Sequence, residues 1–135
     1  MTSSSNIEFV FLLYVPNVLS GRSVAIAAIF VDFDDLEEGI CTMSVAEDWQ
    51  TQVRRLDPDS DVEMLEALLT DIKHRLSSKD ERPNMVRQME DSFSNVVQIS
   101  PRQKCPVAPS PEIIEAFARG LWDTPMPSRS SLGTQ

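Results

Sequence analysis

The sequence predicts an α+β domain, built as a small antiparallel sheet of three to four strands that is packed by three to four helices. Short apolar runs rich in aromatic and β-branched residues fill the first third of the chain, and turn residues separate them. From Trp49 onward, apolar residues recur instead at intervals of three and four, the spacing of a helix face. The length of 135 residues is typical of one domain.

The first third of the chain predicts a three-stranded meander. Ile7 to Val15 is an apolar run that ends at Pro16, and Ser23 to Phe33 is a second, longer run. The second run is apolar on both faces, which indicates a central strand covered on both sides or a strand packed on a partner chain. Its two expected faces are Val24, Ile26, Ala28 and Phe30 against Ala25, Ala27, Ile29 and Val31. An acidic hairpin tip, residues 34–39, leads into the alternating strand Ile40 to Val45.

The middle of the chain predicts two helices. A short helix starts near Ala46 and turns Trp49, Val53 and Leu56 to one face. Residues 57–60 then end this helix and supply polar side chains for the start of the next one. That second helix is the strongest in the sequence, because its apolar residues keep a regular helical spacing over four turns: Val62, Leu65, Leu69, Ile72 and Leu76.

The last third predicts two more helices and one strand. A helix over residues 84–93 has Asn84 as its cap, and residues 95–100 form a short strand that could return to the sheet. A loop rich in proline follows. The final helix runs from Pro111 to Leu121 with Ser110 as its cap. The expected organisation is thus a flexible N-terminus (1–6), a single α+β domain (7–122) and a disordered tail (123–135).

The charge balance argues against nucleic acid as a partner. The formal net charge is −9, from 12 basic and 21 acidic residues, so the mean field of the chain repels polyanions. Only Arg54-Arg55 and residues 102–104 could form a basic patch. No secretory signal precedes the first apolar run, which is too short to cross a membrane. A cytoplasmic location follows, with Cys41 and Cys105 as free, buried thiols.

No residue pattern announces a catalytic, metal or cofactor site. His74 is expected on the polar side of the long helix, where it has no nucleophile beside it. The acidic residues between Asp32 and Glu38, and the series Asp57, Asp59 and Asp61, lack the later ligands of a calcium loop. A hairpin tip and a helix cap explain them better. The cations near Cys105 could favour its thiolate, although no histidine stands beside it.

Three motifs in order resemble the bacterial family of unknown function DUF3037. They are the opening Leu13 to Asn17 with Gly21 and the apolar strand after it, the string Leu56 to Asp61, and the string Asp91 to Ser100. The resemblance runs from about Ile7 to Leu121. It implies a partner role, since members of this family are often encoded beside kinases that resemble the HipA toxin.

The chain departs from the family pattern around the second strand. Family members read Arg-Gly-Glu and then Asn-x-Gly-Val there, whereas this chain has Ser20-Gly21-Arg22 and then four apolar residues, 25–28. A site built on the family's arginine, glutamate and asparagine is therefore not expected here.

Two functions of different classes follow from the sequence. The first is a non-enzymatic protein-interaction or regulatory module of a bacterial multi-protein system, with a HipA-like kinase as the suggested partner. It would bind a protein or a second copy of itself, and it predicts an exposed apolar patch. Its interaction candidates are Trp122, Phe117, Trp49 and Arg22. The alternative is a hydrolase or nuclease-like enzyme with a dispersed polar site, drawn from Asp32, Arg22 and the loop Arg102 to Cys105.

Overall fold

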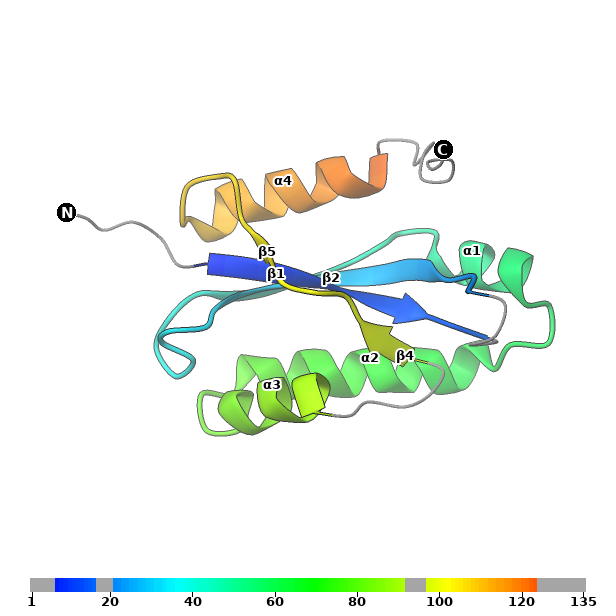
Figure 1. The fold of residues 1–135 in the computed structure, drawn as a ribbon, viewed down its shortest axis with the longest axis horizontal. Helices are drawn as coiled ribbons and strands as arrows, with labels where there is room; N and C mark the ends of the chain where they lie inside the picture. Colours follow the sequence, from blue (N-terminus) through cyan, green and yellow to red (C-terminus); the bar gives the residue numbers. More distant parts are fainter. Residues whose placement is uncertain (1–6, 17–20, 92–96, 124–135) are drawn as a thin grey trace.

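The computed structural model describes residues 7–16, 21–91 and 97–123, which form a sheet with helices on both sides (Figure 1). Three strands come first, then three helices, two short strands and a last helix. The strands are β1 (Ile7–Tyr14), β2 (Val24–Asp32), β3 (Cys41–Val45), β4 (Val97–Ile99) and β5 (Gln103–Lys104). The helices are α1 (Trp49–Leu56), α2 (Val62–Ser77), α3 (Arg82–Asp91) and α4 (Pro111–Asp123).

The sheet has the order β3-β2-β1-β4, and β5 also pairs with β1. All of these pairings are antiparallel. The meander of the first third is confirmed, and β4 does return to the sheet as a fourth strand. The short strand β5 was not predicted, because two exposed polar residues in a proline-rich segment carry no strand pattern.

Helices cover both faces of the sheet, and each face has its own hydrophobic core. In Figure 1, α2 and α3 lie on one side of the strands and α4 lies on the other. The larger core joins the first face to α1, α2 and α3, with Leu65 and Ile72 fully buried. The smaller core joins the second face to α4 through Ile114 and Ala118. The predicted α+β class is thereby confirmed.

Strand β2 is the central strand of the described sheet. Ile29 and Phe30 are consecutive residues that are both 0% exposed, and they belong to the two different cores. An apolar strand with no polar face is stable in this place because helices cover it on both sides. Of the two explanations that the sequence allowed, the structure shows the covered central strand.

The predicted alternation of β2 is wrong at its start, because Val24 and Ile26 both pack against the larger core and not with Phe30 in the smaller one. The register against β1 shifts between Leu12 and Leu13, which pair with Ala27 and Ala25. Ile26 is therefore the extra residue of a β-bulge, and it packs in the same core as Ala27 instead of on the face of Phe30. A bulge depends on how two strands pair, so the pattern of β2 alone does not reveal it.

Three predicted helix boundaries need correction. Helix α1 begins at Trp49 rather than near Ala46, because Ala46 still donates its N–H to the Ile26 carbonyl of the sheet. Helix α3 begins at Arg82, so Asn84 lies inside its first turn and is not its cap. Helix α4 ends at Asp123 rather than at Leu121.

Helix α2 follows its prediction closely. It spans Val62–Ser77, and the side chain of Asp61 accepts a hydrogen bond from the Met64 N–H at 3.0 Å. This is the cap that residues 57–61 predicted, and it satisfies one of the free N–H groups at the start of the helix.

The expected flexible N-terminus lies outside the described residues, and so does the expected tail, except for Asp123. The expectation of buried thiols is wrong, because Cys41 and Cys105 are both half-buried. Cys41 stands in an edge strand and Cys105 in the loop after β5, which explains the partial exposure of both. Burial still raises the pKa of Cys41 to about 11, an effect that nearby Arg82 partly offsets.

Candidate functional site

The backbone of β3 points half of its hydrogen-bonding groups toward β2 and the other half away from the sheet. Asp32 donates to the Ile40 carbonyl and Ala46 donates to the Ile26 carbonyl, both at 3.0 Å. In an antiparallel ladder the bonded pairs alternate, so the even-numbered residues from 40 to 46 face β2. The outward groups belong to Cys41, Met43 and Val45. Among the described residues, none pairs with these groups.

The opposite edge of the sheet is closed in a different way. β4 and β5 both pair with β1, and they are only three and two residues long. Between them, Ser100 donates its N–H to the Phe11 carbonyl and accepts from the Phe11 N–H through its hydroxyl. Cys105 donates to the Ile7 carbonyl. Short strands and a proline-rich segment protect an edge from pairing with another chain, so β3 is the more open edge of the described sheet.

The side chains of β3 do not block its edge. The strand reads CTMSV, with no charged residue, proline or glycine, and all five residues are half-buried. Lysine, proline and bulges are the usual means by which proteins prevent pairing at an edge. None of them is present in this strand. An edge of this kind can accept an extended segment of another chain by hydrogen bonding to its backbone.

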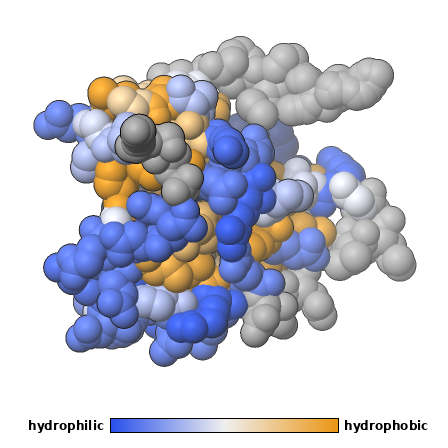
Figure 2. Space-filling view, turned by 60° about the vertical axis from the view of Figure 1, so that its left-hand side comes forward, coloured by the Kyte–Doolittle hydropathy of each residue, from blue (hydrophilic) through white to orange (hydrophobic). Residues whose placement is uncertain are grey.

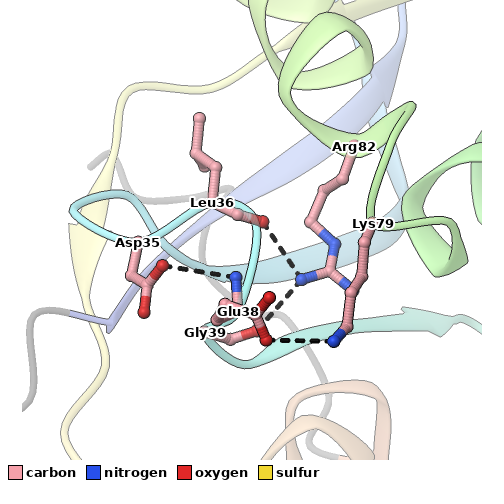
Figure 3. Close-up of polar contacts among 6 residues, drawn as sticks. All are labelled: Asp35, Leu36, Glu38, Gly39, Lys79 and Arg82. Carbon is pink, nitrogen blue, oxygen red and sulfur yellow. Dashed lines mark hydrogen bonds and ion pairs between the residues drawn. The ribbon is translucent and has the colours of Figure 1, made fainter.

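The acidic hairpin between β2 and β3 is tied down by residues from the helical layer (Figure 3). The Arg82 guanidinium donates Nη1–H to the carbonyls of Leu36 and Gly39, at 3.1 and 3.0 Å. Its Nε–H donates to the Leu76 carbonyl at 2.8 Å. Lys79 lies 3.0 Å from a carboxylate oxygen of Glu38. The start of β3 is therefore held in place.

Gly39 closes this hairpin where no larger residue fits. A Cβ atom at this position would lie 2.6 Å from the Asp35 carbonyl oxygen and 2.7 Å from the Cβ of Asp32. Distances this short between nonbonded atoms require the backbone to move. The glycine thus fixes the path of the chain into β3.

Trp122 covers one face of β3 and joins it to α4. Its indole N–H donates to the Ser44 hydroxyl at 2.9 Å, and its ring meets Phe11 edge-on with centroids 6.0 Å apart. The residue is half-buried, and its contacts with Ser44 on β3 and Phe11 on β1 place the indole over the face of the sheet that α4 covers. Of the predicted interaction candidates, Trp122 is the one that lies next to β3.

The other two aromatic candidates pack in the hydrophobic cores of the protein. Trp49 is 7% exposed and belongs to the larger core. Phe117 is half-buried in the smaller core, where its ring lies 6.0 Å from those of Phe9 and Phe30. Both side chains stabilise the fold, and little of either reaches the surface.

Arg22 lines a shallow pocket at the opposite end of β2 from the hairpin. The pocket has a volume of about 200 Å³. It brings two guanidinium groups, from the start of β2 and from α1, above a partly apolar floor. Its lining residues are Arg22, Ser23, Val24, Gln52, Arg55 and Leu56. A cavity with two arginines has the chemistry to accept a small carboxylate or phosphate group.

The residues of the enzyme alternative do not form one site. Asp32 and the loop from Arg102 lie at the same end of the sheet, where Asp32 and Cys105 both neighbour Ile7 of β1, but Arg22 is far from them. Asp32 and Arg22 stand at opposite ends of β2, and a nine-residue strand is about 30 Å long. Asp32 accepts a hydrogen bond from the Asp34 N–H within its own turn. Arg102 is held by Glu90, with Nε 2.8 Å from the carboxylate, and it stacks 3.7 Å from the centroid of the Phe33 ring. These contacts give the side chains structural roles.

The remaining polar candidates also have local explanations. His74 is exposed on α2, as its place in the sequence predicts. No group of three metal-ligating side chains occurs within residues 7–16, 21–91 and 97–123. Tyr14 donates its hydroxyl to Asp57 at 2.7 Å, and burial together with this carboxylate raises the pKa of Tyr14 to about 12. Its phenol therefore stays protonated at neutral pH.

The exposed apolar patch that the sequence predicted stays a prediction. The large and strongly exposed hydrophobic residues of the described surface are Met64 and Ile113, at 43% and 45%. They lie on α2 and α4, which cover opposite faces of the sheet. In Figure 2 the apolar residues that reach the visible face are interrupted by hydrophilic ones. The open backbone of β3 is the feature that sequence reasoning missed, although its uncharged CTMSV string was visible.

Comparison with known proteins gives one match. The sequence profile of a family described as "Protein of unknown function (DUF3037)" matches residues 9–117, which reach from β1 into α4. No curated protein and no solved structure matches the chain. None of the helices in the described ranges has the length and apolar character needed to cross a membrane.

Proposed function

The chain belongs to the DUF3037 family of proteins of unknown function, and on that basis we propose that it is a non-enzymatic protein-interaction module. The observation that carries this proposal is the open edge of β3, whose outward backbone groups on Cys41, Met43 and Val45 pair with no described residue. A strand of a partner protein would extend the sheet by pairing with β3.

Two further features support this function. The hairpin before β3 is held by Arg82 and Lys79, so the strand is presented in a fixed position and loses little conformational freedom on binding. Trp122 is half-buried and donates a hydrogen bond to Ser44 of the same strand, and tryptophan is a typical anchor of protein interfaces. A regulatory role in a bacterial multi-protein system, with a HipA-like kinase as partner, is the context that the family resemblance suggests.

The alternative, a hydrolase or nuclease-like enzyme, has less support. Its proposed residues are distributed over both ends of β2 and already bind neighbouring groups. The pocket beside Arg22 includes the hydroxyl residue Ser23, but its lining contains no carboxylate or histidine that could activate that hydroxyl as a general base.

The test uses two variants at one position. Cys41→Pro removes an outward backbone N–H from the first residue of β3, where proline is tolerated. The control Cys41→Val keeps this N–H and has a side chain of similar size. Each protein would be tagged, used to capture partners from its native cells, and examined by light scattering of the eluate. We expect a stoichiometric protein partner with the wild type and with Cys41→Val, and its loss with Cys41→Pro.

Thermal unfolding of the three proteins serves as the control for folding. If Cys41→Pro is folded and captures the same partner as the wild type, or if the wild type elutes as a monomer without any partner, the proposal is wrong. Trp122→Ala provides a second measurement, because it should weaken capture while leaving the backbone of β3 unchanged.

A further inference from the structure

The residues that flank β3 in the sequence carry charge of one sign only. From Ser23 to Val53 the chain has no lysine, arginine or histidine, and it has seven acidic residues. Six of these are exposed and flank β3 in the sequence: Asp34, Asp35, Glu37 and Glu38 precede the strand, and Glu47 and Asp48 follow it. An uncharged strand of five residues thus has an acidic group at each end.

Few of these charges are neutralised within the protein. In the part of the chain that the structure describes, Glu38 alone among the six forms a salt bridge, with Lys79. Asp48 accepts a hydrogen bond from the neutral Gln52 amide. Asp35 accepts a hydrogen bond from the Glu38 N–H, which does not neutralise its charge. A segment that docks on β3 brings its own flanking residues within a few ångströms of these carboxylates. That distance is shorter than the Debye length of about 8 Å at physiological salt.

A second copy of the chain fits this edge poorly. The outward groups allow an antiparallel pair of β3 strands about a two-fold axis, with Met43 opposite its own copy and Cys41 opposite Val45. In the same pairing the turn before one β3 strand would approach the turn after the other, and both turns carry exposed acidic residues, Glu38 and Glu47 among them. Both ends of the paired strands would therefore join acidic groups, and like charges facing each other across a ladder are destabilising.

We infer that the segment received by β3 is a strand of a different protein, with an uncharged core of about five residues and lysine or arginine beyond each end. The inference rests on the proposed function and names the chemistry of its partner. Five residues span about 17 Å in an extended strand, which is the length of the uncharged strand β3 between its two acidic flanks. The core would place alternate side chains beside Met43 on one face and beside Ser44 and the Trp122 indole on the other.

The test uses two labelled peptides that share the core Thr-Val-Thr-Val-Thr. One carries two lysines at each end and the other carries two glutamates at each end. Fluorescence anisotropy would measure their binding to the full chain at low and at moderate salt. We expect the lysine peptide to bind with an affinity that falls as salt rises, and the glutamate peptide to bind at least about tenfold more weakly, since several screened charge pairs contribute together.

Variants then separate the edge from its charge. The double variant Glu37→Gln and Glu47→Gln removes one carboxylate before β3 and one after it. It should lower the affinity of the chain for the lysine peptide about fivefold. Cys41→Pro should abolish its binding, whereas Cys41→Val should not. Equal binding of the two peptides, no binding of the lysine peptide, or no effect of the double variant would overturn the inference on charge. The proposed function would still stand if capture of a partner depends on the Cys41 N–H.

Other occupants of the edge would give different results. Met43→Cys in a Cys41→Val background places two thiols opposite each other in a symmetric pair of β3 strands, with Cα atoms about 5.5 Å apart, a distance that a disulfide spans. A covalent dimer absent from the Cys41→Val parent would show that a second copy occupies the edge, and would overturn the inference.

The chain's own C-terminal segment is the other alternative occupant. Lysine-peptide binding that appears only after residues 124–135 are deleted would show that this segment occupies the edge, and would also overturn the inference.

Discussion

The guanidinium of Arg82 donates to three backbone carbonyls, one at the end of α2 and two in the hairpin before β3. Arginine suits this position because its planar fork reaches several acceptors in fixed directions, whereas the lysine ammonium is a compact charge whose three donors all lie on one nitrogen. The positive charge that contacts the acidic hairpin is thus used to fix its backbone.

We expect Arg82→Met to lower the free energy of unfolding by about 3 kcal/mol, since several hydrogen bonds from a charged donor are lost together. Arg82→Lys should restore about half of that loss. Urea unfolding of the three proteins measures both effects. A lysine variant as stable as the wild type would mean that charge alone, and not the fork, holds the hairpin.

The Tyr14 hydroxyl bonds to Asp57 at the junction of α1 and α2, and the pKa of Tyr14 is raised from 10.0 to about 12. The unfolded chain releases this proton near pH 10, while the folded protein keeps it until about pH 12. The stability from this group is therefore complete below pH 10 and is lost as pH rises from 10 to 12.

Tyr14 is the single tyrosine of the chain, so an ultraviolet titration of the folded protein reports it directly. We expect a midpoint near pH 12. At neutral pH, Tyr14→Phe should lower the free energy of unfolding by about 1 kcal/mol. Above pH 10 the stability of the wild type should fall more steeply than that of Tyr14→Phe. A midpoint near 10 would show that the phenol is not held by Asp57.

At the scale of the element, β3 has one edge that the fold uses and one that it leaves open. The even-numbered residues bond to β2, and the odd-numbered residues between them point outward. Neighbouring positions along the strand should therefore tolerate proline very differently.

We expect Thr42→Pro to destabilise the protein by about 1 to 3 kcal/mol, because it leaves a buried carbonyl of β2 without its donor. Cys41→Pro, one residue earlier, should lower the free energy of unfolding much less, since the Cys41 N–H has no partner among the described residues to lose. Thermal unfolding of both variants, beside Cys41→Val, makes the comparison. Equal costs at the two positions would contradict the register on which the interaction proposal depends.

At the scale of the whole molecule, two hydrophobic cores share one strand. Ile29 and Phe30 are consecutive residues of β2 that point into the larger and the smaller core, respectively. Because the same backbone supports both cores, a loss of packing on either face weakens the sheet for the other.

We expect Ile29→Ala and Phe30→Ala to lower the free energy of unfolding by about 2 to 5 kcal/mol each, as truncations in closely packed cores do. Each variant should still unfold in a single cooperative transition. Unfolding of each variant would be followed by circular dichroism and by tryptophan fluorescence, and the two curves should coincide. A separate early transition in Phe30→Ala would show that α4 and the smaller core unfold independently.

Local patterns in the sequence determined the elements that depend on local physics. The spacing of apolar residues predicted α2, and the acidic residue before it is its cap, because both properties are set within one or two turns of chain. The unbroken apolar run of β2 predicted a strand without a polar face, and the three family motifs predicted the match over residues 9–117.

Only the tertiary structure decided the features that depend on which segments meet. Pairing with β1 makes Ile26 a bulge and turns two exposed residues, Gln103 and Lys104, into a strand. Packing joins Arg82 to a hairpin more than forty positions away in sequence. The openness of β3 is of the same kind, since a strand carries identical groups on both of its edges. Its partners in the sheet, and not its own residues, decide which of them stay free.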